Sequence, residues 1–276
     1  MSGDLDRLYV ERLLEMARGS SLGAVVILAH DRTYDAQGRA TEGGYFYVPN
    51  EYVLKLAKEH PEFLPGVSIH PGRPDALEEL ERCLAGGAVL MKCLPNCQDI
   101  NCNDRRFTRF WERMAEARLP LLAHTGGEHT LPILRPEYAD PRILSLPLEC
   151  GVNVIAAHCA TKSGLRDPEY FHIFTGMTRR FPNLYGDTSA FNVPIRGRHA
   201  PECIRPPLSE RMVHGSDFPV PVHGHWAWLR GFITWEQFRK WERQPNILER
   251  DYQLKLAMGF PAEAFMRAWN LLRLVS

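Results

Sequence analysis

The stretch VNVIAAHCA (152–160) shows the pattern from which the fold can be inferred, because it is an apolar run that ends on a histidine. Two further runs end in a similar way: PLLAHTGG (120–127) on His124, and MVHGSDFPVP (212–221) on Asp217. Each run is short, and those at 120–127 and 212–221 run into Gly or Pro, which indicates buried strands rather than helices. All three strands therefore end on a residue that can bind a metal ion or transfer a proton.

The same unit recurs along the chain: an apolar run, a polar loop and then a stretch with helical spacing. Helix candidates at 74–87 and 103–118 begin on Pro-Asp and Asn and place apolar side chains on one stripe. Strands that are apolar nearly throughout and alternate with helices indicate a parallel sheet. The expected strands are 23–30, 64–70, 88–94, 119–125, 153–159, 183–189 and 211–217.

This arrangement predicts an α/β fold, a (β/α)8 TIM-barrel-like domain that occupies residues 1–276. Only seven strands can be counted, and a helix at 4–18 precedes the first of them, so the first barrel strand is expected to be missing or substituted. The gap would expose unpaired strand edges. It could be covered by the N-terminal helix or by a partner chain, so a homo-oligomer is one expectation. Residues 226–275 predict helices that close the end.

Composition narrows the function classes. The 33 basic and 33 acidic side chains give no net charge, so nothing favours binding to nucleic acid or to an anionic membrane. No apolar run reaches the roughly 18 residues that a membrane span needs. The N-terminal stretch predicts an amphipathic helix rather than a signal peptide, and the seven scattered cysteines suit reduced thiols. We therefore expect a cytoplasmic protein that acts on a small molecule.

In a parallel barrel the carboxyl ends of the strands meet at one rim, where the chemistry takes place. Strand starts lie some 20 to 40 residues apart, yet their ends would converge there. The polar residues at these ends are His30, His70, Lys92, His124, His158, Asp187 and Asp217. Two neutral imidazoles and a carboxylate suit zinc or a similar divalent ion with an open position for water. His124 and His158 are the candidate metal ligands, and Asp217 is a ligand, a general base or both.

The order of LMKCLP, LLAHTG, IAAHC and GSDFP resembles the amidohydrolase superfamily. More narrowly, it resembles the amidohydrolase-related (amidohydrolase 2) metal-dependent hydrolases, which include decarboxylases of the carboxymuconate-semialdehyde type. The likeness covers about residues 20–275 and includes the terminal stretch FPAEAFMRAWNLLRL.

The resemblance implies that the metal is served by His124 and His158, which match the family's histidines on strands five and six, and by Asp217, which matches its strand-eight aspartate. Lys92 matches the strand-four lysine that some members use as a metal-bridging carbamate, and we take Lys92 and Asp217 as the candidate catalytic residues.

One departure from the family pattern is clear. The family's first strand carries His-x-His, which supplies two metal ligands, and this chain has neither that strand nor those ligands. Its His-x-His is His223-Gly224-His225, after the last strand. Three explanations are open: the chain is truncated or its start is placed too late, the family site has decayed, or His223 and His225 fold back over the rim and substitute.

Three functions follow from these observations. The first is a metal-dependent hydrolase, with zinc as the expected ion, that cleaves an amide, lactone or similar bond in a small carboxylated or cyclic substrate. The second is a non-oxidative decarboxylase of an aromatic or dienoic acid. The third is a catalytically degenerate barrel that binds a metabolite or a partner. For His30, His70 and Asp187 we favour structural roles, and Arg32, Arg73, Arg196 and Arg198 could hold a substrate carboxylate.

Overall fold

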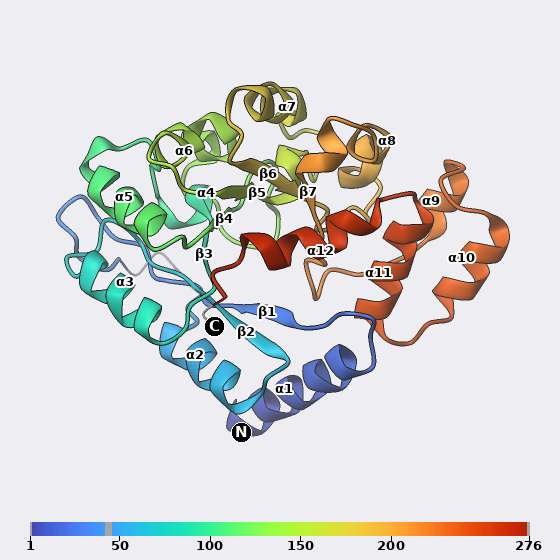
Figure 1. The fold of residues 1–276 in the computed structure, drawn as a ribbon, viewed down its shortest axis with the longest axis horizontal. Coiled ribbons are helices and arrows are strands. Elements are labelled where there is room, and N and C mark those ends of the chain that lie inside the picture. Colours follow the sequence, from blue (N-terminus) through green and yellow to red (C-terminus); the bar gives the residue numbers. More distant parts are fainter. Residues whose placement is uncertain (1, 42–45, 275–276) are drawn as a thin grey trace.

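The computed structural model describes residues 2–41 and 46–274, and within them seven parallel strands form one sheet in the order β1 to β7. Each strand pairs with the next one along the chain, as repeated βα units require (Figure 1). The strands are β1 (Val25–Leu28), β2 (Phe63–Val67), β3 (Leu90–Cys93), β4 (Leu121–Ala123), β5 (Val154–Ala156), β6 (Leu184–Asp187) and β7 (Met212–Val213). The curled parallel sheet with its helices confirms the predicted (β/α)8-like fold with seven strands.

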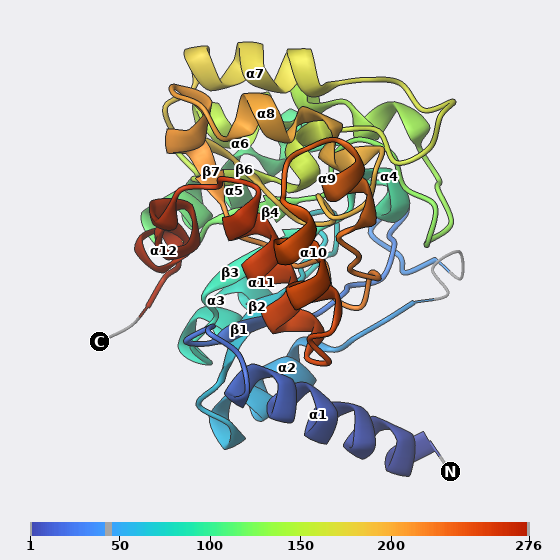
Figure 2. The ribbon, with the colours of Figure 1, turned by 90° about the vertical axis from the view of Figure 1, so that its right-hand side faces the viewer.

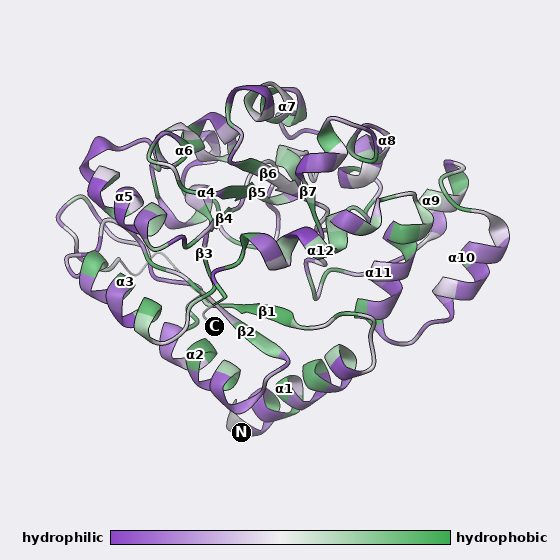
Figure 3. Cartoon of the chain, in the orientation of Figure 1, coloured by the Kyte–Doolittle hydropathy of each residue, from purple (hydrophilic) through white to green (hydrophobic). Residues whose placement is uncertain are grey.

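Twelve α-helices accompany the strands in the described part of the chain. They are α1 (Ser2–Arg18), α2 (Asn50–Glu59), α3 (Ala76–Ala85), α4 (Pro95–Gln98), α5 (Thr108–Glu116), α6 (Ser145–Glu149), α7 (Phe171–Arg180), α8 (Ala200–Cys203), α9 (His225–Leu229), α10 (Trp235–Glu242), α11 (Ile247–Ala257) and α12 (Ala262–Leu271). The surface helices have hydrophobic and hydrophilic sides, whereas the strands are mostly hydrophobic (Figure 3).

The helices α3 and α5 show why these segments fold as they do. Leu80 and Leu84 of α3 are buried, and so are Trp111 and Met114 of α5, because residues three and four apart share one face of a helix. The strand between them, β3, contributes Met91 and Cys93 to the same buried cluster, so helices and strand share one core. A single buried side chain such as Trp111 contributes about 2–3 kcal/mol by this burial.

The barrel is open between β1 and β7. Along β1 the alternating ladder to β2 directs the backbone groups of Val26 and Leu28 toward the open side, and the Leu28 side chain is partly exposed. At the other end α12 covers the edge of β7: Ala264 O accepts the His214 N–H at 2.9 Å, and the Arg267 guanidinium donates to Met212 O. These bonds satisfy polar groups that an eighth strand would otherwise pair.

The N-terminal helix does not take this role at β7. The helix α1 lies along the lower edge of the molecule in both ribbon views (Figures 1 and 2). Its second half is packed, with Leu14 and Met16 buried, and Asn246 Nδ2 donates to Met16 O at 2.8 Å. Leu5 and Leu8 in its first half are exposed. The edge of β7 is therefore covered by one of the helices predicted over 226–275, and not by the N-terminal helix.

Candidate metal and active site

Two imidazoles lie side by side at the carboxyl end of the sheet. His124 follows β4 directly, and His158 lies in the turn after β5. The two strands pair in parallel with Leu122 opposite Ile155, which brings their ends together. The ring centroids of His124 and His158 are 5.1 Å apart with an edge-to-face arrangement, and both side chains are buried. The sequence prediction that these residues share one rim agrees with this placement.

A strained turn presents His158 to the site. His158, Cys159 and Ala160 have φ values of 59°, 52° and 55°, a left-handed conformation that costs a non-glycine residue about 1–2 kcal/mol. Asp187 at the end of β6 stabilises this turn: its Oδ1 accepts the His158 N–H at 2.7 Å, and its backbone O accepts from the Cys159 thiol. Such strain is concentrated at functional sites, where surrounding contacts fix the geometry.

The hydrogen bonds of His158 fix its tautomer. Nδ1 lies 3.1 Å from the backbone O of Ser189 and 2.8 Å from its Oγ. A carbonyl oxygen only accepts, so Nδ1 carries the proton and Nε2 keeps its lone pair. The Ser189 hydroxyl in turn donates to Asp187 Oδ1. This arrangement is typical of metal-binding histidines, whose second nitrogen donates to a protein oxygen.

Asp217 completes the group that the sequence predicts. It lies four residues beyond β7, and its Oδ2 is 4.0 Å from His158 Nδ1. Asp217 also has a positive φ of 61°, so a second ligand candidate sits on an unusual backbone conformation. Burial raises the pKa of Asp217, and the nearby Lys92 charge opposes this rise.

Glu128 is a member of the site that sequence reasoning missed. Its Oε2 lies 3.6 Å from His124 Nε2, and its side chain is buried. The other carboxylate oxygen, Oε1, accepts from the backbone amides of Thr130 and Leu131, which orients the group. The only sequence signal was an acidic residue four positions after His124, in a loop without periodicity.

Lys92 and Arg196 bring positive charge close to the imidazoles. Burial lowers the pKa of His124, and Lys92 of β3 and Arg196 lower it further. Burial also holds the pKa of His158 well below its usual range, again with a contribution from Arg196. Both rings are therefore neutral at pH 7, which is the form that binds metal ions. Lys92 and Arg196 also act on Asp217, so the predicted residues belong to one electrostatic environment.

Arg196 ties two of the rim loops together. It is buried, and its guanidinium donates to Thr161 O at 3.2 Å and to Gly127 O at 2.7 Å. These carbonyls belong to the loops after β5 and β4. The neighbouring Gly126 has φ +79°, and a Cβ there would meet Thr161 O at 2.2 Å, so only glycine fits at this close approach.

The donor set of this rim suits a divalent ion. His124 Nε2 is buried and has no hydrogen-bond partner among the described residues, a state that normally costs free energy unless a ligand pairs it. His158 Nε2 keeps its lone pair, and two carboxylates lie beside the rings. The donors are not gathered tightly, however. In the part of the chain that the structure describes, the one group with three donor atoms within 4.8 Å of each other is His223, His225 and Glu242.

The other residues singled out in the sequence lie in different surroundings. Structural roles fit His70, whose ring bonds Gln98 O and the Gly72 amide, and Asp187, which caps the His158 turn. His30 differs, because neither of its buried ring nitrogens has a partner within the described residues, and the Lys92 charge contributes to the lowering of its pKa after burial. His223 pairs with Glu242 of α10.

The fold and the rim together define a protein of the α/β-barrel class with ionisable side chains at the carboxyl ends of its strands. A family model described as Amidohydrolase matches residues 19–251, and the chain belongs to this family. Amidohydrolase family members generally use a divalent metal. No helix within the described residues has the length and apolar character that a membrane span needs.

Two solved structures illustrate the likeness. An uncharacterised TIM-barrel protein from Bordetella bronchiseptica is 19% identical, with 90% of this chain and 83% of that chain covered and a TM-score of 0.58. Amidohydrolase 2 from Bifidobacterium longum subsp. infantis is 16% identical, with 98% and 87% covered and a TM-score of 0.51. At these identities the likeness shows the fold. A comparison with curated proteins found no match.

Proposed function

We propose that this protein is a metal-dependent hydrolase that acts on a small carboxylated or cyclic substrate by metal-activated water. The observation that carries the proposal is the pair of neutral, buried imidazoles beside Asp217, with the Nε2 of His124 unpaired among the described residues and the Nε2 of His158 keeping its lone pair. Membership of the amidohydrolase family supports the same class of chemistry.

The residues that would hold the ion are His124, His158 and Asp217, and the nearby Glu128 offers a further oxygen. Zinc fits a mixed nitrogen and oxygen donor set. A bound divalent ion of this kind lowers the pKa of water from about 16 to about 7 and so supplies a nucleophile at neutral pH.

Proton transfer and binding of the substrate carboxylate are assigned to side chains of the rim. In this proposal Asp217 accepts a proton from the attacking water and returns it to the leaving group. Lys92 and Arg196 place positive charge around the rim, which attracts and orients a carboxylate on the substrate.

A substrate panel tests this function. Stripped protein, with and without added zinc, is assayed against small carboxylated lactones, cyclic amides and N-acyl amino acids, and carbon dioxide release is followed on aromatic and dienoic acids. We expect zinc-dependent hydrolysis of at least one class. Asp217→Asn should lower kcat/KM by about 100-fold or more, while His60→Asn, on a residue outside the rim, should not. Carbon dioxide release without hydrolysis would identify a decarboxylase, and silence on both panels would favour a binding role.

A further inference from the structure

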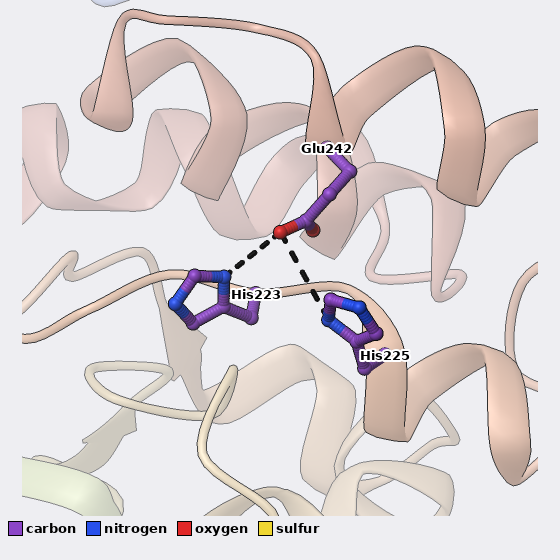
Figure 4. A group of neighbouring side chains, drawn as sticks. All are labelled: His223, His225 and Glu242. Carbon is purple, nitrogen blue, oxygen red and sulfur yellow. Dashed lines mark hydrogen bonds and ion pairs between the residues drawn. The ribbon is translucent and has the colours of Figure 1, made fainter.

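We propose that His223, His225 and Glu242 form a second divalent-cation site, separate from the strand-end rim and independent of the function proposed above. His223 lies in the loop that leads into α9, His225 is the first residue of α9, and Glu242 is the last residue of α10. All three side chains point toward one another (Figure 4).

The donor atoms already lie close to the spacing of a metal site. Glu242 Oε1 is 2.8 Å from His223 Nδ1 and 3.9 Å from His225 Nδ1, and the three donors all lie within 4.8 Å of one another. Tetrahedral zinc with bonds of about 2.0–2.1 Å holds its ligand atoms roughly 3.4 Å apart. Small side-chain rotations would therefore bring the three donor atoms to this spacing. The ion would replace the present bond between His223 and Glu242, with the His223 ring proton on Nε2.

The backbone around the site orients the carboxylate. Gly224 N–H donates to Glu242 Oε2 at 2.9 Å, which leaves Oε1 directed at the histidines. A Cβ at Gly224 would meet Leu254 at 3.0 Å and Phe238 at 3.2 Å, so glycine allows the loop to pack closely against α10 and α11. Such additional bonds to ligating groups commonly orient metal sites.

The charges and exposure of the site define which ion it takes. His223 and His225 are 59% and 62% exposed, so solvent reaches the donors, while Glu242 is only 22% exposed. Arg250 Nη1 is 4.0 Å from Glu242 Oε1, but its guanidinium is engaged by the carbonyls of Val222 and Gln244. Two imidazoles and one carboxylate favour Zn²⁺, Ni²⁺ or Cu²⁺ over Mg²⁺ or Ca²⁺. The bound ion would tie the loop after β7 to α10.

Zinc titration of the full chain tests the site. The protein carries no histidine tag, is stripped with chelator, and is titrated with Zn²⁺ against a chromogenic indicator. We compare wild type with His223→Asn/His225→Asn and with Glu242→Gln. His129→Asn is the matched control, because His129 is an equally exposed histidine 3.0 Å from the single carboxylate of Asp167. Asp217→Asn is included to separate this site from the rim.

We expect the double variant to lose one zinc equivalent and Glu242→Gln to bind that equivalent at least about tenfold more weakly, since even the loss of a group that only orients a ligand has an effect of that size. The variants His129→Asn and Asp217→Asn should still bind the zinc equivalent that the double variant loses. Zinc, but not magnesium, should raise the melting temperature of wild type more than that of the double variant. Unchanged zinc number and affinity in a folded double variant would overturn the proposal.

Discussion

Lys255 Nζ donates a hydrogen bond of 2.7 Å to the carbonyl of Gly215, two residues before Asp217. Lys255 lies on α11 and is completely buried, as is its partner Asp251, one turn earlier on the same helix. Asp251 also accepts from His214 and Asn192. A buried ionic network on a C-terminal helix thus anchors the loop that carries the candidate catalytic aspartate.

The first prediction concerns this anchor. Lys255→Met leaves the Asp251 charge buried without its cation, so we expect the free energy of unfolding to fall by about 3–5 kcal/mol in urea denaturation. The matched control is Lys55→Met, since Lys55 forms an exposed pair with Glu59 at the same i,i+4 spacing. That change should cost at most about 0.5 kcal/mol. Equal effects of the two substitutions would show that the buried network does not anchor the loop.

The second prediction concerns the strained turn at His158. Asp187→Ala removes the acceptor of a buried backbone N–H, and we expect a loss of about 1–3 kcal/mol in the free energy of unfolding. Asp187→Asn keeps one oxygen acceptor and should cost less. Circular dichroism during urea unfolding measures both variants. If Asp187→Ala is as stable as wild type, the carboxylate does not hold this turn in place.

The third prediction compares a glycine that packs closely against another loop, Gly126, with a helical glycine that has free space around it, Gly176. Gly126→Ala should destabilise the protein by more than about 2 kcal/mol, because its φ is +79° and the new Cβ would lie 2.2 Å from Thr161 O. Gly176→Ala in α7 is the control: a Cβ there would meet nothing within 4 Å beyond its own helix, and alanine favours the helix by up to about 1 kcal/mol. Melting temperatures should therefore shift in opposite directions. A shift in the same direction for both variants would refute the close packing at Gly126.

The fourth prediction is a pH dependence. Burial lowers the pKa of His70 to about 4, whereas the unfolded chain titrates near 6.5. Between these values the unfolded state binds a proton that the folded state does not, so stability is complete above about pH 6.5 and falls as the pH drops toward 4. The loss from this group is roughly 3 kcal/mol. Urea unfolding at pH 7, 6 and 5 should show a shallower decline for His70→Gln, and parallel curves would contradict the assignment.

Much of the fold could be predicted because its strands are buried on both faces. Runs such as those around Leu122 and Ile155 have no polar side, so their pattern indicates a parallel sheet directly. The polar residue that follows each run then marks the rim. The covering of the β7 edge by α12 could not be predicted, because it depends on individual hydrogen bonds from Arg267 and His214, which leave no periodic pattern in the sequence.

The site was predictable only in part, for a related reason. His124, His158 and Asp217 follow strands, and strand order alone places them together. Glu128 sits in an irregular loop, and its approach to His124 depends on how the Thr130 turn folds. The pairing of His223 with Glu242 joins a loop to a helix, and neither pattern nor spacing predicts such a contact.

The zinc content of the rim tests the central claim most directly. In a His223→Asn/His225→Asn background, which removes the surface histidines, inductively coupled plasma mass spectrometry is applied to stripped and zinc-reconstituted protein. We predict about one zinc ion per chain, and its loss when His124→Asn and His158→Asn are added to a protein that remains folded by circular dichroism. A background protein without zinc, or one whose zinc content is unaffected by these two substitutions, would contradict the account.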